Sequence, residues 1–514
     1  MTQQNQKTKT SPLSQSALAK VAASHPEVEL PGYDRASVRA GIVHFGVGGF
    51  HRAHQAVVVD ELLKEGSGQE WGIVGVGVLP GDVAMRDALS AQDGLYTLVR
   101  KHPDGRVDAR VIGSIIDYLF APDDPERVIE LLADPGVRIV SLTITEGGYS
   151  FDQVTGAFDS STPAIQADLA PGAVPQTVFG LVLEALARRR ERGIAPFTIM
   201  SCDNIQGNGD KARTVFSAFA SLRDPEIGRW VIDQVAFPNS MVDRITPVTT
   251  DEDRRLVEHE FGITDRWPVV AEPFFQWVLE DRFPGGRPPY DTAGVQLVED
   301  VEPYELMKLR LLNASHQGMA YFGYLSGHRY AHEATADPAI GSFLRDYMDQ
   351  EATPTLRPVP GVDLDAYKTT LIERFANPAI RDTLARLCAE SSDRIPKWLL
   401  PVIREQLRAG GDIRRSAAIV ASWARYAEGV DEQGEPIYVV DRDADELVRI
   451  ARTQRENPIA FIANRKYFGD LAEDDRFREV YLEALESLIE RGAAATVRAL
   501  VEDGSRGENA RIGD

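Results

Sequence analysis

Gly41-Ile-Val-His-Phe-Gly-Val-Gly-Gly-Phe-His-Arg-Ala-His54 begins as a short apolar run and passes into a glycine-rich turn. Residues 41–46 read as a buried strand, and an apolar helix through Leu63 follows the turn. A strand, a glycine turn and a helix in this order form the context that a dinucleotide-binding motif requires. The order predicts an α/β fold with a Rossmann-like domain.

The glycines of this turn predict where a cofactor binds. Glycine permits a tight turn and the close approach of a pyrophosphate, which then lies at the positive end of a helix. The third glycine of the usual fingerprint is absent, and His51 stands in its place. His51 and His54 share a helix face, which suggests zinc, but no third ligand is suitably spaced, so cofactor-loop or packing roles are favoured. The predicted cofactor-binding residues of the turn are Gly46, Gly48, Gly49, Phe50 and His51.

An acidic residue follows the second strand, which we expect over residues 71–78. Asp82 lies just past its end. An acid in this place accepts hydrogen bonds from an adenosine ribose and disfavours a 2′-phosphate, so it favours NAD over NADP. Asp82 is equally suited to cap a helix that begins at Val83. The two roles are compatible.

Polar side chains also follow later strands. The β run over residues 137–145 ends at Glu146, and a strand over 197–202 is followed by Asn204. In open α/β sheets, ligands collect at the carboxyl ends of the strands. We therefore expect Glu146 and Asn204 to lie near a ligand, although each could instead cap a helix.

Residues 302–323 predict a mostly apolar helix with one polar arc. If each residue turns the helix by about 100°, then Glu305, His316 and Asn313 lie about 60°, 80° and 140° from Lys308. A buried lysine is costly unless it is paired or neutral. A lysine that snorkels from a core helix is the plain alternative. The arc is the first candidate for a catalytic centre.

The strand signal largely disappears near residue 300, and helical patterns dominate from there on. This predicts a flexible N-terminal extension over residues 1–35, a Rossmann-like NAD-binding domain over 36–297 and a helical domain over 298–514. The helical domain is expected to bind substrate and carry the catalysis. No Gly/Ser linker separates the two domains, so we expect them to pack together with the active site in the cleft between them.

Composition restricts the partners. The 514 residues carry a formal net charge of −22, which argues against binding to nucleic acid or anionic membranes. Two cysteines are too few for a disulfide framework or a thiolate metal site. No run of eighteen apolar residues and no secretory signal are present, so a cytoplasmic location is expected.

Six motifs, taken together and in order, resemble the polyol-specific long-chain dehydrogenase/reductase family. They are Gly46-Val-Gly-Gly-Phe-His-Arg-Ala-His54, Thr145-Glu-Gly-Gly-Tyr149, Ser201-Cys-Asp-Asn-Ile-Gln-Gly-Asn-Gly209, Pro238-Asn-Ser-Met-Val-Asp-Arg-Ile-Thr-Pro247, Lys308-Leu-Arg-Leu-Leu-Asn-Ala-Ser-His316 and Arg394-Ile-Pro-Lys397. The resemblance covers residues 35–495. It implies an NAD-dependent, metal-independent oxidoreductase that interconverts a polyol and a ketose, with D-mannitol and D-fructose as the first expectation.

The resemblance also implies roles for individual residues. Lys308 corresponds to the catalytic base, Asn204 and Asn313 to the amides that hold the reacting oxygen, and His316 to a residue that positions substrate and lysine. The remaining implied residues are Glu305 and Glu146 on a proton path, and Asp243, Arg386 and Arg394 along the polyol chain. The family has lysine where this chain has Arg394. A monomer or weak homo-oligomer is expected.

Other functions stay open. A fructuronate or tagaturonate reductase would need a cationic clamp, for which Arg386, Arg394 and Lys397 are candidates. Arabinitol and sorbitol are alternative substrates. A catalytically silent nucleotide-binding protein on the same fold would be expected to lose the base, yet Lys308 is present.

Overall fold

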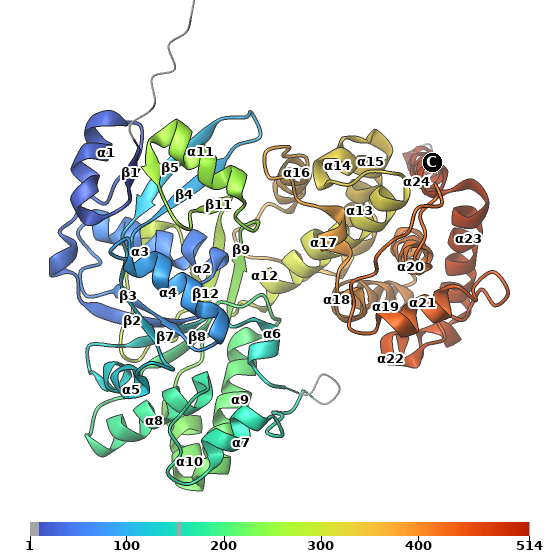
Figure 1. Cartoon of the computed structure of the whole chain (residues 1–514). Coiled ribbons are helices and arrows are strands. Elements are labelled where there is room, and N and C mark those ends of the chain that lie inside the picture. Colours follow the sequence, from blue (N-terminus) through green and yellow to red (C-terminus); the bar gives the residue numbers. More distant parts are fainter. Residues whose placement is uncertain (1–9, 152–155, 513–514) are drawn as a thin grey trace, which may run out of the picture. The chain divides into compact units, whose positions relative to one another are not determined.

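The computed structural model describes residues 10–151 and 156–512, with the backbone alone given for 503–512. The chain divides into two compact units, Met1–Glu302 and Pro303–Asp514. The first unit holds every named strand of the described residues, and the second is helical (Figure 1). The predicted α/β class, with a Rossmann-like domain followed by a helical domain, is confirmed.

A five-stranded parallel sheet forms the centre of the first unit, in the order β6-β3-β2-β7-β8. Its strands are β2 (Ala40–Phe45), β3 (Gly72–Gly77), β6 (Ile115–Phe120), β7 (Ile139–Leu142) and β8 (Thr198–Ser201). The chain starts at β2, builds outward through β3 to β6, and then crosses back to β7 on the other side of β2. The switch point, where ligands bind in such sheets, therefore lies between the ends of β2 and β7.

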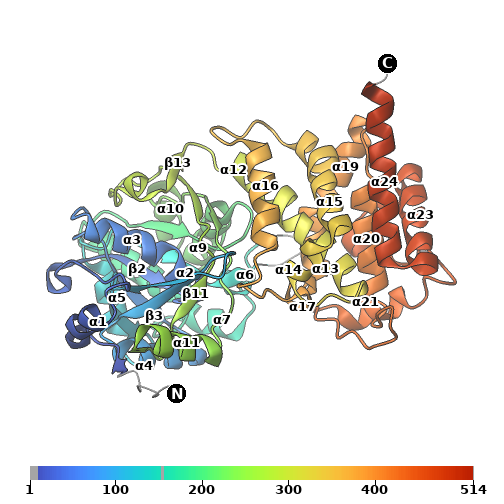
Figure 2. The same cartoon turned by 90° about the horizontal axis from the view of Figure 1, so that it is seen from above.

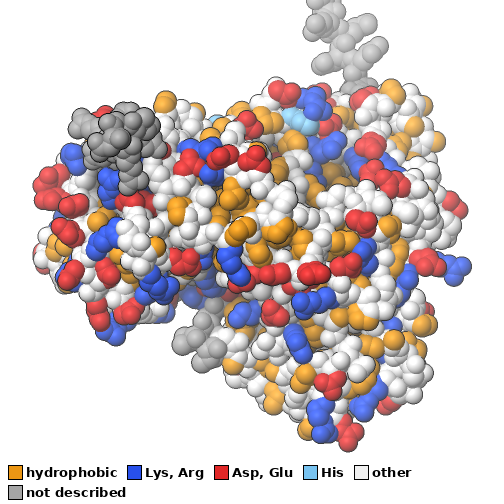
Figure 3. All heavy atoms as spheres, turned by 180° about the vertical axis from the view of Figure 1, so that it is seen from behind, with side chains coloured by type: hydrophobic (Ala, Val, Ile, Leu, Met, Phe, Trp, Pro, Cys, Tyr) orange, Lys and Arg blue, Asp and Glu red, His pale blue; other side chains and the backbone are white. Residues whose placement is uncertain are grey.

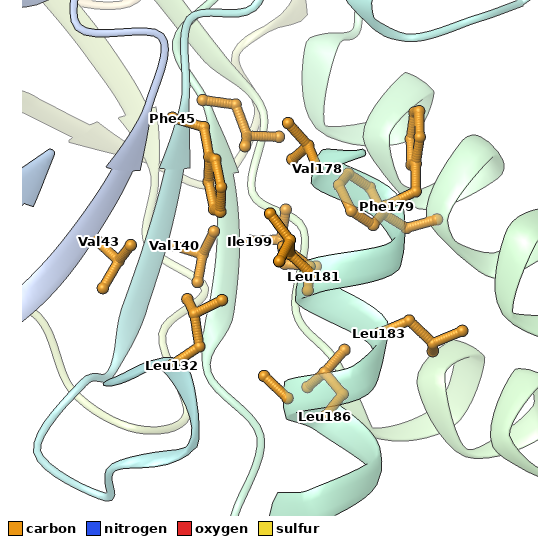
Figure 4. Packing of buried hydrophobic residues seen from close by; sticks show 14 of the residues in the cluster. Val43, Phe45, Leu132, Val140, Val178, Phe179, Leu181, Leu183, Leu186 and Ile199 are labelled. Carbon is orange, nitrogen blue, oxygen red and sulfur yellow. The ribbon is translucent and has the colours of Figure 1, made fainter. Parts of the chain in front are cut away.

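Alternate residues of these strands enter two separate cores, because side chains of a strand point to opposite faces. Val43 and Phe45 pack with Val140 and Ile199 in one core. Figure 4 shows these side chains directed at Leu181 and its neighbours on α8. Ile42, Ile73 and Ile139 enter the other core, against α3. Burial on both faces explains why the strands read as continuous apolar runs.

Eleven α-helices are assigned within the described part of the first unit. They are α1 (Leu18–Ser24), α2 (Gly49–Ala53), α3 (Gln55–Lys64), α4 (Val83–Ser90), α5 (Pro125–Ala133), α6 (Thr145–Gly148), α7 (Pro163–Leu169), α8 (Val178–Glu191), α9 (Asn208–Arg223), α10 (Pro225–Gln234) and α11 (Asp251–Phe261).

Three smaller sheets complete the first unit. The predicted hairpin forms as β4 (Tyr96–Lys101) and β5 (Val107–Ile112), and β11 (Val269–Ala271) joins β4. A second sheet has the order β13-β12-β9, with β9 (Ser240–Asp243), β12 (Gln276–Glu280) and β13 (Gln296–Val298). In the third, β1 (Ser11–Pro12) pairs with β10 (Ile263–Thr264).

The predicted flexible extension over residues 1–35 is not what the structure shows for residues 10–35. Besides the β1 pairing, Leu13, Leu18 and Val21 lie in a hydrophobic core together with Val99 and Ile263. The polar composition of the first sixteen residues suggested disorder, but a few apolar side chains are enough to anchor the segment once a partner core exists.

Helices account for the second unit. It begins with α12 (Glu302–Met307), a π-helical turn (Lys308–Asn313) and α13 (Ala314–Leu325). The remaining α-helices are α14 (Ala331–Ala336), α15 (Pro338–Tyr347), α16 (Leu364–Phe375), α17 (Leu384–Cys388), α18 (Ser391–Trp398), α19 (Leu400–Ala409), α20 (Arg414–Tyr426), α21 (Ala444–Ala451), α22 (Arg465–Phe468), α23 (Asp475–Arg491) and α24 (Ala493–Ile512). Helix α13 is the central one, because α14, α15, α17, α20 and α24 all pack against it (Figure 2).

The surface is charged and mixed. Acidic and basic side chains are interspersed over the face seen in Figure 3. Within the ranges that the structure describes, no helix is both long and apolar enough to cross a membrane.

Candidate functional site

The glycine turn lies at the switch point of the parallel sheet. Gly46 follows β2 with a φ of 89°, in the left-handed region that favours glycine. A Cβ on Gly46 would lie 2.1 Å from the carbonyl oxygen of Thr143, so the turn is pressed against the end of β7. A Cβ on Gly48 would find only the Gly46 oxygen, at 3.8 Å. Gly46 is thus required by packing, whereas Gly48 leaves room for a ligand to approach the backbone.

His51 takes the place of the third glycine by stacking. Its ring lies 3.4 Å from that of His44 on β2, with an angle of 14° between the planes. His44 is held by Ser141 Oγ at 2.8 Å and Thr143 Oγ1 at 2.9 Å. A third glycine would allow the helix to pack closely against the strand. Here two stacked rings fill the space between α2 and β2 instead.

Burial keeps both rings neutral. It lowers the pKa of His44 to about 3 and holds the pKa of His51 well below its usual range. In the unfolded chain a histidine takes up its proton near pH 6.5. Below that pH the unfolded state gains protons that the folded state cannot, so stability present above pH 6.5 is lost as the pH falls toward 3.

His51→Phe is expected to make this loss of stability with falling pH less steep. Phenylalanine keeps a flat ring on His44 but removes one titrating group, so the fall in unfolding free energy between pH 6.5 and 4.5 should be shallower by roughly 1 kcal/mol per pH unit. Urea unfolding of the cofactor-free protein across this range measures the two slopes. Parallel curves for the variant and the parent would contradict a neutral, buried His51.

The predicted single helix after the turn is broken at His54. This residue has φ −127° and ψ −94°, which separates α2 from α3. The last carbonyls of α2 are instead bound from outside, because Arg244 donates to Ala53 and Tyr96 donates to Arg52. The ring of His54 packs among aromatic side chains, those of Phe50, Phe275 and Trp277. His51 and His54 thus lie in different packing environments rather than facing a common ligand.

Asp82 is engaged by its own turn. Its Oδ2 accepts the backbone N–H groups of Val78 and Leu79, both at 2.9 Å. It therefore closes the 3-10 turn Pro80–Asp82 that follows β3. Asp82 stands at the N-cap position of α4, but its side chain makes no capping hydrogen bond to that helix, so the capping role weighed above is not observed. The carboxylate lies at the carboxyl end of the second strand, as predicted, and its contact with a ribose stays a prediction.

Glu146 and Asn204 follow neighbouring strands of the sheet. Glu146 lies on α6 after β7, and Asn204 follows β8, which pairs in parallel with β7. Glu146 is half-buried and Asn204 is exposed. Asp243, which was predicted to contact the polyol chain, ends β9 and is buried.

A buried carboxylate between these strand ends escaped the sequence analysis. Asp203 accepts hydrogen bonds from the backbone of Ile144 and Thr145 and from the hydroxyl of Tyr149. Burial raises the pKa of Asp203 to about 6, and these three donors oppose that rise. Its position in the sequence could have indicated it, because Asp203 is an acidic residue that follows an apolar strand and directly precedes Asn204.

In the second unit, a π-helical turn spans Lys308–Asn313, where the sequence predicted a plain α-helix. In an α-helix the residues five apart lie about 140° from each other around the axis. A π-helix bonds residue i to i+5 and winds less per residue, so residues five apart lie closer together around the axis than in an α-helix. The turn therefore brings Asn313 closer to the face of Lys308. Both side chains are buried, and the Asn313 Oδ1 is buried without a hydrogen-bond partner.

Glu305 and His316 flank this turn. Glu305 lies one helical turn before Lys308 and is buried, as is His316 on α13. The imidazole of His316 packs on Phe375 of α16, with 4.4 Å between ring centroids. All four residues of the predicted polar arc are thus buried on consecutive turns of this helical segment, and their shared role stays a prediction.

The cations expected near the polyol chain all have partners within their own unit. Arg386 on α17 forms a two-pronged ion pair with Asp382. Arg394 on α18 donates to the Leu387 carbonyl at 3.0 Å. Lys397 pairs with Asp393, one helical turn earlier. Each of these three side chains thus already bonds another group of the protein, and their role in substrate binding stays a prediction.

Among the described residues, no group of three or more His, Cys, Asp or Glu side chains is arranged to hold a metal ion.

Comparison with known proteins identifies relatives over both units. The mannitol dehydrogenase Rossmann domain matches residues 40–292, and the mannitol dehydrogenase C-terminal domain matches residues 300–489. Mannitol 2-dehydrogenase of Phaeosphaeria nodorum is 49% identical over 91% of this chain and 83% of its own length. The enzyme of the same name from Aspergillus fumigatus is 46% identical over 93% of this chain and 96% of its own.

Two solved structures share the fold. Pseudomonas fluorescens mannitol 2-dehydrogenase, in a ternary complex with NAD and D-mannitol, has a TM-score of 0.86 and 44% identity, and the match covers 96% of this chain and 100% of that one. A substrate-free D-sorbitol dehydrogenase has a TM-score of 0.87 and 37% identity, over 94% of this chain and 100% of that one.

Proposed function

The chain belongs to the mannitol dehydrogenase family, and on that basis we propose that it is an NAD-dependent polyol dehydrogenase that interconverts D-mannitol and D-fructose without a metal ion. The observation that carries the proposal is the π-helical turn. It brings the buried residues Lys308 and Asn313 closer to one face of the helix, in a chain that is 49% identical to a mannitol 2-dehydrogenase.

The residues of the glycine turn fit a dinucleotide. Gly48 leaves space beside the backbone, whereas a Cβ on Gly49 would contact the side chains of Thr246 and Val269. Phe50 and His51 border the turn, and Asp82 lies at the next strand end. When bound, NAD supplies the acceptor for the hydride that leaves the alcohol carbon. The protein supplies position, exclusion of water and the movement of the proton.

Lys308 is the proposed general base. Oxidation of a secondary alcohol requires removal of the hydroxyl proton as the hydride leaves, and a lysine can accept that proton only as a neutral amine. Alkaline pH is therefore expected to favour polyol oxidation, and lower pH to favour ketose reduction. Glu305 and Glu146 are the proposed path by which the proton reaches solvent.

Asn204 and Asn313 are the proposed donors to the reacting oxygen. Their side-chain N–H groups would stabilise the negative charge that develops as the proton leaves, which does the work of a metal ion in other alcohol dehydrogenases. His316 is proposed to orient the substrate and Lys308. Asp243, Arg386 and Arg394 are proposed to contact the rest of the polyol chain.

The ion pairs of the helical unit favour a neutral polyol over a uronate. Recognition of a carboxylate would need cations with donors to spare, and a two-pronged arginine is the usual choice. Two of the three candidate cations are already in ion pairs, Arg386 with Asp382 and Lys397 with Asp393. Arg394 donates to the Leu387 carbonyl and would be the remaining cation of such a clamp. A fructuronate or tagaturonate reductase is thus the second candidate.

A substrate panel tests the proposal. We expect NADH oxidation with fructose near neutral pH and NAD reduction with mannitol at alkaline pH, with turnover by NADPH or NADP at least tenfold lower because Asp82 would repel a 2′-phosphate. Sorbitol, arabinitol, fructuronate and tagaturonate are measured beside them at two pH values. A higher kcat/KM for fructuronate than for fructose would reassign the enzyme as a uronate reductase. If no polyol, ketose or uronate is turned over, the proposed function is wrong.

A further inference from the structure

One buried carboxylate connects the ends of two adjacent strands. Asp203 follows β8, whereas the groups that it binds follow β7. Its Oδ1 accepts the N–H of Thr145 at 2.8 Å, and its Oδ2 accepts the N–H of Ile144 at 3.1 Å. The hydroxyl of Tyr149, which is fully buried, lies 2.8 Å from the same Oδ2. Asp203 itself is 7% exposed, so these contacts are shielded from water.

The backbone that Asp203 holds is strained. Thr145 has a φ of 61°, in the left-handed region that β-branched residues rarely adopt. Such a conformation persists only where its surroundings enforce it, and it is found mainly at functional sites. Hydrogen bonds to a charged acceptor are stronger than those to a neutral one. The Asp203 carboxylate therefore stabilises the strained conformation of Thr145 through its hydrogen bonds to the N–H groups of Ile144 and Thr145.

The other side of Asp203 is anchored as well. Its own carbonyl accepts the side-chain N–H of Asn208 at 3.0 Å. Asn208 also bonds both backbone groups of Ser240 on β9, at 2.8 and 2.9 Å. The loop after β8 is thus tied to β7 through the Asp203 side chain and to β9 through Asn208.

This arrangement links two residues of the proposed mechanism. Asn204 is the residue after Asp203, and Glu146 is the residue after Thr145. We propose that Asp203 is a positioning residue that sets the spacing between Glu146 and Asn204 by holding the strained Thr145 turn. The inference rests on the proposed function, since it takes both residues to serve the reacting alcohol. Asp203 acts through the backbone and does not itself touch the substrate.

Asp203→Asn tests the role with the least change of shape. An amide offers one acceptor oxygen, so one of the backbone N–H groups of Ile144 and Thr145 would face another donor. A misplacement of about 1 Å in a catalytic group costs on the order of 10²-fold in rate. We expect kcat/KM for mannitol to fall by about 30–100-fold, while KM for NAD changes by less than about threefold.

Asp168→Asn is the matched control. Asp168 is also buried in the same unit, 1% exposed against 7% for Asp203. It accepts the backbone N–H groups of Gln176 and Thr177, both at 2.8 Å, on a loop that carries none of the proposed site residues. Its loss is expected to lower the melting temperature and to leave kcat and KM unchanged. If Asp168→Asn reduces kcat/KM as much as Asp203→Asn does, Asp203 contributes only stability and the inference is overturned.

Thr145→Gly provides a rescue that a merely structural role would not show. Glycine adopts a φ of 61° without strain, so the turn would no longer depend on the carboxylate. In the Asp203→Asn background, Thr145→Gly is expected to recover about tenfold in kcat/KM. No recovery would overturn the strained turn as the route by which Asp203 acts.

Hydrogen exchange tests whether Asp203 holds the Thr145 turn, and it does so without a measurement of enzyme activity. In the cofactor-free protein, the amides of Ile144 and Thr145 are expected to be protected, and to exchange at least tenfold faster in Asp203→Asn but not in Asp168→Asn. Equal exchange in all three proteins would overturn the inference even if the enzyme is active. Conversely, if these amides are protected but the protein turns over no polyol, the role of Asp203 in holding the Thr145 turn is supported and the proposed function is wrong.

Discussion

Lys308→Ala is expected to lower kcat for mannitol oxidation by about 10²–10⁴-fold, the usual range for loss of a positioned general base. Lys308 begins the π-helical turn, and its side chain is buried on the face that Asn313 shares. Alanine keeps the helix and removes only the amine. Steady-state rates with saturating NAD and mannitol at alkaline pH measure the loss, and binding of NADH by fluorescence should stay within about threefold of the parent.

Two further measurements separate a base from a structural lysine. Lys368 is another buried lysine of the helical unit, paired with Asp349 and Asp365, and Lys368→Ala is expected to reduce thermal stability while kcat is kept. Methylamine, which can enter the space left by Lys308→Ala, is expected to restore part of the rate in proportion to its unprotonated fraction. Full activity in Lys308→Ala would exclude this residue as the base.

The second large effect concerns Asn313, for which we expect a loss in kcat of about 10²–10³-fold on replacement by alanine, as for removal of one donor to a developing oxyanion. The π-helical turn brings this amide closer to the face of Lys308. In the proposed mechanism donor and base address the same oxygen. Asn204→Ala is expected to give a loss of similar size. Pre-steady-state rates of NADH formation measure the chemical step directly.

Asn313→Asp discriminates between stabilisation of charge and packing. Aspartate has the shape of asparagine, so a packing role predicts that it is tolerated better than alanine. A carboxylate would instead repel the developing alkoxide, and the proposed role predicts that Asn313→Asp is at least as inactive as Asn313→Ala. An aspartate variant that is markedly more active than the alanine variant would contradict the assignment.

The helix around Lys308 illustrates how far sequence reasoning reaches. Apolar periodicity and good helix formers predicted the helix, and its polar residues are buried. The angle between Lys308 and Asn313 could not be predicted, because it depends on a π-helical turn. Such turns are rare and appear mostly as single turns inside α-helices, so local composition gave no reason to expect one here.

The N-terminal segment and the nucleotide turn illustrate the same limit. Residues 1–16 are polar, and disorder was a reasonable expectation, yet Leu13 and Leu18 are buried against residues some 80 to 250 positions away in the chain. At the turn, the sequence placed His51 where a third glycine was expected. Only the neighbouring strand explains the exchange, because the partner of the ring is His44, stacked at 3.4 Å.

By itself the sequence determined the α/β class, the glycine turn after the first strand of the parallel sheet, the polar strand ends and the helix that carries Lys308. These features depend on local periodicity and on residue chemistry, which can be read from the sequence directly. The tertiary structure alone decided the π-helical turn from Lys308 to Asn313, the His44–His51 stack and the Asp203 bridge between β7 and β8. The stack and the bridge join groups from different strands and helices, and the π-helical turn is a departure from regular helix geometry, so all three exist only in the folded chain.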